Sequence, residues 1–221
     1  MRSINVMQCG LGIPSKTTYL GEGAFSGCHV LENVSLPGGL IAIPDRAFES
    51  CINLKSINLS ESTISIGDYA FAFCSSLTEI SIPDSVSTIG EGAFRFSGLE
   101  KVAIPLGVAK LEYVTFEGCA SLEKITIPSN VKRIEYSAFA ECSSLHEFVM
   151  EDNGVNYIGS RAFDLCPQLK NIRIPNSVST IENNAFWRCS LDSIVVDNVQ
   201  NAIPDAPWGC GCQNVQWLRT E

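Results

Sequence analysis

Apolar and polar residues follow a single frame that returns about every 23 residues along this chain. Residues 82–98, IPDSVSTIGEGAFRFSG, come back almost unchanged at residues 174–190 as IPNSVSTIENNAFWRCS. A phenylalanine marks each copy, at successive spacings of 23, 23, 23, 22, 23, 24 and 23 residues: Phe25, Phe48, Phe71, Phe94, Phe116, Phe139, Phe163 and Phe186. One unit of this length cannot bury its own apolar face, so the period predicts a solenoid whose units stack on one another.

The first part of each unit predicts a β-strand. In residues 77–83, LTEISIP, isoleucine alternates with polar residues, which is typical of a half-buried strand. Pro83 ends this strand because it cannot donate a hydrogen bond to a ladder. Stacked at about 4.8 Å per strand, nine such segments would form a parallel sheet roughly 40 Å long.

The rest of the unit predicts a second extended segment and a helical turn. Residues 86–89, VSTI, are short and β-branched, which favours a brief strand on the opposite wall. The next position holds Gly, Pro or Glu, and Pro44 followed by Asp45 is typical of a helix start. One or two helical turns would then place the phenylalanine and the residue three positions later on the same inward face.

The whole chain, residues 1–221, is interpreted as one solenoid, with repeats over residues 8–197 and a degenerate capping repeat over residues 198–221. In this last copy Trp208 stands in place of the phenylalanine, and Trp217 adds bulk that would shield the final rung. Residues 8–14, QCGLGIP, already have the pattern of a strand and carry no polar capping motif. They predict either a longer array or self-association through that sheet edge.

Composition and charge narrow the class of partner. The chain is 45% apolar and 18% charged, which is typical of a globular protein, and its net charge is −9. An acidic chain is a poor partner for nucleic acid, which requires a basic face. No apolar run approaches the roughly 18 residues of a membrane span, which argues against membrane insertion. The start, MRSINVMQCG, lacks the apolar core of a secretory signal, so either a leader has been removed or the protein stays in the cytoplasm.

The combination of I-x-I-P with I-G-x-x-A-F-x-x-C, as in residues 77–94, LTEISIPDSVSTIGEGAF, resembles the Treponema-pallidum-type, or BspA-like, leucine-rich repeats of bacterial and protist surface proteins. The resemblance covers roughly residues 11–217. It implies a right-handed curved solenoid, binding of proteins including host-matrix proteins, cell attachment, and a place at the cell surface or in the periplasm. It brings no catalytic residues. The predicted fold class is therefore α+β, with about nine rungs, a parallel sheet on the concave face, and short helical turns and strands on the convex side.

Cysteines form a column of their own in the repeat. Seven of the ten lie three residues after the repeat phenylalanine, and Ser97 fills the remaining slot: Cys28, Cys51, Cys74, Cys119, Cys142, Cys166 and Cys189. They are either buried apolar fillers or disulfides between rungs. Equivalent Cβ atoms would stay about 4.8 Å apart, outside the preferred ~3.5–4.5 Å of a disulfide, which favours buried thiols.

Cys210 and Cys212 lie outside this column, and three interpretations are open: a disulfide, a zinc site, or residues that fill the cap. The absence of the usual C-x-x-C spacing favours cap filling. The two histidines, His29 and His146, suggest no catalytic pair, because Cys28 and His29 are only sequence neighbours. We therefore predict no enzyme, no cofactor and no metal.

The outward positions of the predicted strands are the candidate protein-binding surface. They carry small residues and charges of both signs, and we single out five: Glu79, Lys101, Lys124, Glu147 and Arg173. These side chains form either a shallow concave platform for a protein ligand or a solvated face whose neighbouring charges, Glu79 with Lys101 and Lys124 with Glu147, compensate each other. The columns hold no aromatic anchor, the usual hot-spot residue.

Aromatic residues gather elsewhere. Phe73 and Phe96 occupy the same slot in adjacent rungs, two residues after the repeat phenylalanine. They either roof the core or form a convex patch exposed for contact.

The leading hypothesis for function is a non-catalytic protein–protein interaction module, acting as a bacterial or protist surface adhesin that binds a host extracellular-matrix or receptor protein. The alternative is an intracellular scaffold or a structural spacer with no ligand of its own. A catalytic or metal-binding repeat protein is the third hypothesis, and it would need a pocket converging on His146 or on Cys210 and Cys212.

Overall fold

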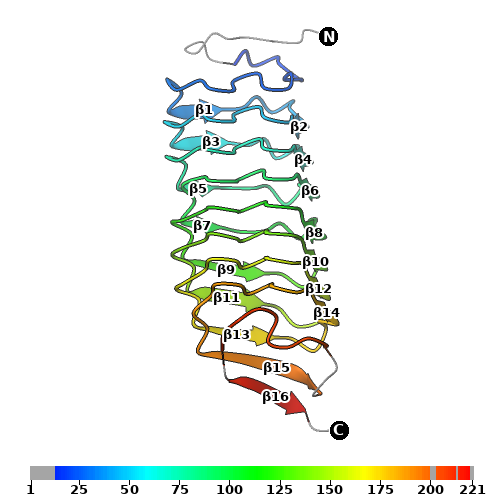
Figure 1. Cartoon of the computed structure of the whole chain (residues 1–221). Helices are drawn as coiled ribbons and strands as arrows, with labels where there is room; N and C mark the ends of the chain where they lie inside the picture. Colours follow the sequence, from blue (N-terminus) through cyan, green and yellow to red (C-terminus); the bar gives the residue numbers. More distant parts are fainter. Residues whose placement is uncertain (1–12, 200–202, 213, 220–221) are drawn as a thin grey trace.

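The computed structural model describes residues 13–199, 203–212 and 214–219. Most turns of the chain contribute two short strands, and these strands line up in two columns along the molecule (Figure 1). Column A consists of β1 (Asn33–Ser35), β3 (Ser56–Asn58), β5 (Glu79–Ile80), β7 (Lys101–Val102), β9 (Lys124–Ile127), β11 (Glu147–Met150), β13 (Asn171–Ile174), β15 (Ser193–Val199) and β16 (Val215–Arg219). Column B consists of β2 (Ala42–Ile43), β4 (Ser65–Ile66), β6 (Thr88–Ile89), β8 (Lys110–Leu111), β10 (Arg133–Ile134), β12 (Tyr157–Ile158) and β14 (Thr180–Ile181).

Paired strands in both columns are parallel and lie one repeat apart, so equivalent residues sit side by side. Asn33 pairs with Ser56 in column A, and Arg133 pairs with Tyr157 in column B. Ladder pairing joins β1–β3, β5–β7, β9–β11 and β13–β15–β16 in column A, and β2–β4–β6 and β8–β10–β12–β14 in column B. The predicted stacking of repeats in register is confirmed.

The predicted helical turns are wrong. The described residues contain strands and turns but no helix, and hence no helix that could cross a bilayer. The chain is a parallel β-solenoid of about eight turns rather than an α+β protein of nine rungs. The cause lies in the backbone on either side of each repeat phenylalanine. Beside Phe71, for example, φ is 53° at Tyr69 and 61° at Phe73, whereas a helix needs negative φ at every residue.

On this third side of the rung, which we call the turn side, backbone N–H groups bond to the next rung. Three N–H groups of one rung, those of Tyr69, Phe71 and Phe73, donate at 2.8, 2.8 and 2.7 Å to the carbonyls of Glu91, Ala93 and Arg95. A left-handed conformation costs an L-residue about 1–2 kcal/mol, and these bonds between rungs offset that cost. The positive-φ slots accept Arg, Tyr and Val as well as Gly, so they leave no glycine signature in the sequence.

The repeat phenylalanines form a continuous internal stack, as predicted. From Phe48 to Phe186 every repeat phenylalanine is fully buried, and successive rings lie nearly parallel with centroids 5.2–5.7 Å apart. Phe148 of β11 adds edge-on contacts with Phe139 and Phe163 at 5.1 and 4.6 Å. This stack, with the Leu and Ile side chains of the strands, is the core of the solenoid.

The cysteine column also points inward. Five free thiols are buried and that of Cys189 is half-buried. Each of these six thiols donates a hydrogen bond to the carbonyl of the repeat phenylalanine in the preceding rung. Cys74 Sγ, for example, lies 3.1 Å from Phe48 O. The buried-thiol interpretation is confirmed for the five buried residues. Cys28 is buried too, but it is disulfide-bonded and therefore not a free thiol.

The C-terminal end of the core is closed by tryptophan. Trp208 is buried and contacts both Phe186 and Trp217 edge-on, with centroids 6.5 and 6.4 Å apart. Cys210 and Cys212 are joined by a disulfide, which corrects the expectation that they only fill the cap. The N-terminal segment over residues 8–12, on which the predicted self-association depends, lies outside the described residues.

Candidate functional site

The outward face of column A holds the five charged residues singled out from the sequence. Alternation along each strand turns apolar residues inward and polar ones outward: in β9, Ile125 is buried and Lys124 is exposed. Because the strands are parallel and in register, Glu79 lies beside Lys101 and Glu147 lies beside Lys124. Arg173 occupies an outward position of β13 on the same face.

Two ion pairs lie on this face, and in each pair the two opposite charges neutralise each other. Lys101 Nζ lies 2.5 Å from Glu79 Oε2, and this hydrogen bond raises the pKa of Lys101. Lys55 Nζ lies 2.8 Å from Glu32 Oε2, and its hydrogen bond lowers the pKa of Glu32. All four side chains are well exposed, so each pair adds little to stability.

Arg173 is also neutralised, by residues that the sequence did not suggest. Its guanidinium lies 2.9 Å from Asp152 and also contacts Asp197. The two carboxylates come from different rungs, one after β11 and one within β15. Arg173 is therefore held in place between two acids.

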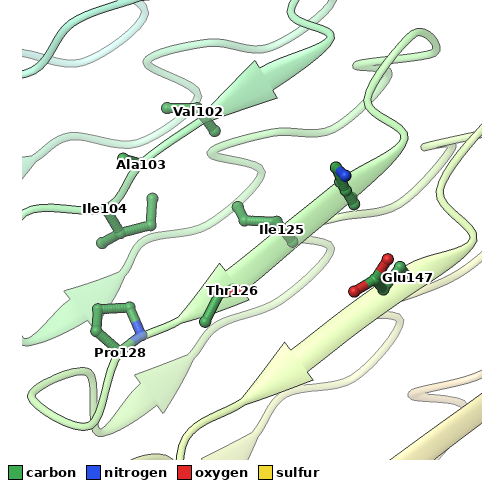
Figure 2. Close-up of a pocket in the computed structure, with 8 residues that line it drawn as sticks. Val102, Ala103, Ile104, Ile125, Thr126, Pro128 and Glu147 are labelled. Atoms are coloured by element: carbon green, nitrogen blue, oxygen red, sulfur yellow. The ribbon is translucent and has the colours of Figure 1, made fainter.

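Lys124 and Glu147 differ from these paired residues, because neither forms a salt bridge within the described ranges. Their strands nevertheless pair at these two positions. Both line a hollow of about 400 Å³ on the face of column A. The other lining residues are Val102, Ala103, Ile104, Ile125, Thr126 and Pro128. Figure 2 shows Ile104 and Pro128 on one side of the hollow and Glu147 on the neighbouring strand.

This hollow lies where ladder pairing between β7 and β9 is interrupted. Ala103 is exposed and Val102 is half-buried, so these two side chains offer accessible apolar surface next to the buried Ile104 and Ile125 (Figure 2). A second hollow of about 440 Å³ shares Val102 and Ala103 and extends toward the Glu79–Lys101 pair. Together the two hollows form a shallow groove with an apolar floor and charged flanks, which we call the column A groove.

The Phe73–Phe96 pair lies on the turn side. The two rings stack with centroids 5.4 Å apart, and the guanidinium of Arg95 lies 6.0 and 5.0 Å from them. Phe73 is 37% exposed and Phe96 is half-buried, with its ring against Gly118. Because the ring faces pack on each other, on Arg95 and on Gly118, the pair covers the turns and leaves only part of Phe73 open to a partner.

A second turn-side group was not predicted from the sequence. Trp187 is 38% exposed, and the guanidinium carbons of Arg161 and Arg188 lie 5.0 and 4.5 Å from its ring centroid. The sequence did contain one signal for Trp187. It directly follows the repeat phenylalanine Phe186, and in the other seven copies this slot holds no aromatic residue.

The cysteines and histidines form no metal-binding cluster in the part of the chain that the structure describes. No group of three or more His, Cys, Asp or Glu side chains there could hold a metal ion. Burial raises the pKa of Cys51 to about 11 and that of Cys119 to about 12, so both remain protonated thiols at neutral pH. His146 is exposed, with Nδ1 3.1 Å from Ser144 O.

Comparisons with known proteins give a consistent family. A family model described as "BspA type Leucine rich repeat region", in six copies, matches residues 9–119 and 98–210. A solved leucine-rich repeat protein from Bacteroides ovatus is 30% identical with a TM-score of 0.64, over 85% of this chain and 57% of that one. The leucine-rich repeat protein of T. pallidum is 28% identical with a TM-score of 0.61, over 76% of this chain and 81% of that one.

A leucine-rich cell surface protein from Faecalibacterium prausnitzii shares the fold at 24% identity, with a TM-score of 0.56 over 92% of this chain and 64% of that one. The chain thus spans less than two thirds of the Bacteroides and Faecalibacterium proteins. No curated protein matches the sequence.

Proposed function

Because the chain belongs to the BspA-type leucine-rich repeat family, we propose that it is a non-catalytic protein-binding module that acts as a surface adhesin toward host proteins. Solenoids of this kind commonly bind partners along the surfaces that stacked repeats create. The resemblance of the repeats to those of bacterial and protist surface proteins supports attachment to a host matrix or receptor protein.

The column A groove is the proposed contact surface, and Lys124 and Glu147 carry the proposal. Neither has an ion-pair partner among the described residues, so a protein ligand can pair with both without breaking an existing salt bridge. The apolar floor beside them offers area whose burial would add affinity. Glu79, Lys101 and Arg173 belong to the same surface, but their charges are already compensated, so we assign them to its rim.

The test is binding to a panel of purified, immobilised extracellular-matrix proteins. Lys124→Glu and Glu147→Lys should each weaken binding roughly tenfold or more, because each places a like charge against the partner's complementary group. The double variant Glu79→Lys/Lys101→Glu is the matched control, since it reverses charges on the same face but keeps an ion pair on the rim.

Unchanged binding by both single variants would exclude the column A groove as the contact surface. Failure of the unmodified protein to bind any matrix protein would refute attachment to the host matrix and would favour an intracellular scaffold or a spacer.

A further inference from the structure

The turn side of the last rungs presents an exposed aromatic residue in contact with two arginines. We define the Trp187 cluster as Arg161, Trp187 and Arg188. The indole of Trp187 is 38% exposed although its neighbour Phe186 is buried in the core stack. Both guanidinium groups lie within 5.0 Å of the indole centroid.

One side of the cluster is rigid. Arg188 binds Asp164 through two bonds, Nε to Oδ1 at 2.9 Å and Nη2 to Oδ2 at 2.6 Å. Asp164 is only 5% exposed, so the guanidinium is fixed to a buried group and supports the indole. A side chain held in place before binding loses less conformational entropy on contact with a partner.

The other side of the cluster has unused hydrogen-bond donors. Six arginines lie between residues 13 and 199, and five of them have a carboxylate within 4 Å: Arg46, Arg95, Arg133, Arg173 and Arg188. Arg161 is the exception in this range, and its guanidinium lies against the Trp187 ring instead. The indole N–H of Trp187 likewise has no acceptor among the described residues, whereas that of Trp208 donates to Pro204 O at 2.6 Å.

We propose that the Trp187 cluster is a docking site for an acidic protein segment. A carboxylate of that segment accepts hydrogen bonds from the Arg161 guanidinium and from the indole N–H, and an adjacent apolar side chain packs on the indole. Trp and Arg are the residues most enriched among those that dominate protein interfaces, and a guanidinium matches a carboxylate in planar geometry.

The charge of the surroundings selects a carboxylate over a polyanion. Only one positive charge in the cluster is unmatched, because Arg188 is neutralised by Asp164. Glu141 also acts on Arg188 electrostatically, and the chain as a whole has a net charge of −9. Nucleic acid would be repelled by such a surface, whereas a single carboxylate beside an apolar residue fits it. This site is separate from the column A groove and does not depend on it.

The experiment follows the indole N–H resonance of Trp187 by two-dimensional ¹H–¹⁵N NMR. The probe is the peptide acetyl-Gly-Glu-Leu-Gly-amide, which has a single carboxylate beside an apolar residue, and the control probe carries Gln in place of Glu. The acidic peptide should shift the Trp187 resonance saturably, and the Gln peptide should bind about tenfold more weakly or worse, as expected for the loss of a charged hydrogen bond. Raising the salt concentration should weaken binding of the acidic peptide, because exposed charges are screened.

Arg161→Gly separates binding from folding. Arg161 has φ 56°, so glycine suits this backbone and the variant should keep its thermal midpoint while losing the response to the acidic peptide. Arg46→Gly is the matched control, because Arg46 occupies the same slot of another rung, also with φ 56°, and should leave the response unchanged. The proposal is overturned if the acidic peptide causes no saturable shift, if both peptides bind equally, or if Arg161→Gly retains binding.

Discussion

Replacing Phe139 with alanine tests the stacked core where most rings meet. Phe139 is fully buried, lies parallel to Phe116 and Phe163 at 5.3 and 5.7 Å, and meets Phe148 edge-on at 5.1 Å. Removing a buried phenylalanine costs about 3–5 kcal/mol through reduced burial and the cavity left behind. The substitution also removes the ring–ring attraction to these three neighbours, about 0.5–1.5 kcal/mol per pair, so we expect the upper part of that range.

The measurement is urea unfolding, followed by circular dichroism for the whole chain and by tryptophan fluorescence for the C-terminal rungs, where all three tryptophans lie. Each rung of a solenoid contacts only its neighbours, so a cavity in the middle also weakens the coupling between the two halves. The two signals should therefore separate in Phe139→Ala, whereas they should coincide in the unmodified protein.

Two further variants calibrate this result. Phe116→Ala removes a fully buried ring with two stacked neighbours and should also cost about 3–5 kcal/mol. Phe73→Ala removes a ring that is 37% exposed and should cost clearly less. If Phe139→Ala shifts the unfolding midpoint by no more than Phe73→Ala does, the assignment of the repeat phenylalanines to the stabilising core is refuted.

Three other predictions concern the turn side and the thiols. Gly118→Ala should destabilise the protein by about 1–3 kcal/mol in urea unfolding, because the residue has φ 70° and a Cβ there would lie 2.2 Å from the Phe96 ring. The hydrogen bond to Glu91 raises the pKa of Tyr69 to about 12, so the native state holds this proton more tightly than the unfolded chain, whose tyrosine pKa is about 10. The stabilisation is complete below pH ~10 and is lost as pH rises toward 12, so the unfolding free energy should fall more steeply there in the unmodified protein than in Tyr69→Phe. In thiol labelling with DTNB, Cys189 should react in the folded protein, because its thiol is half-buried whereas the other five free thiols are buried.

Matched variants decide each of these cases. Gly27→Ala shares φ 70° but has open space around the added Cβ, so it should cost less than Gly118→Ala; equal costs would contradict the contact with the ring. Equal pH dependence in Tyr69→Phe and the unmodified protein would contradict the Tyr69–Glu91 linkage. Cys189→Ser should lose one native-state label, and Cys142→Ser, which removes a buried thiol, should lose none until the protein is unfolded.

Part of the candidate site followed from the period alone. Residues one repeat apart in parallel strands lie side by side, so Glu79 and Lys101 were expected to pair, and they do. The same argument placed Lys124 beside Glu147, but backbone register does not choose side-chain rotamers, and no ion pair forms between them within the described residues. Arg173 is neutralised by acids from two other rungs, at positions that do not share its slot in the repeat.

The turn side shows the limit of local reasoning most clearly. Pro44 followed by Asp45 favoured a helix start, because both residues suit the first positions of a helix. A local pattern of this kind reports only on neighbouring residues in the sequence. What excludes the helix is a set of hydrogen bonds to the next rung, which hold residues as different as Arg46 and Val114 at positive φ.

The repeating residues were enough to predict the period, the inward phenylalanines, the buried thiol column and the parallel stacking. Each of these features returns from unit to unit, and a repeated apolar residue has only one place to be buried. Tertiary structure alone decided the conformation of the turns, the pairing of the charges and the exposure of Trp187. These depend on contacts between rungs and on individual side-chain geometry, which a repeating pattern of residues does not encode.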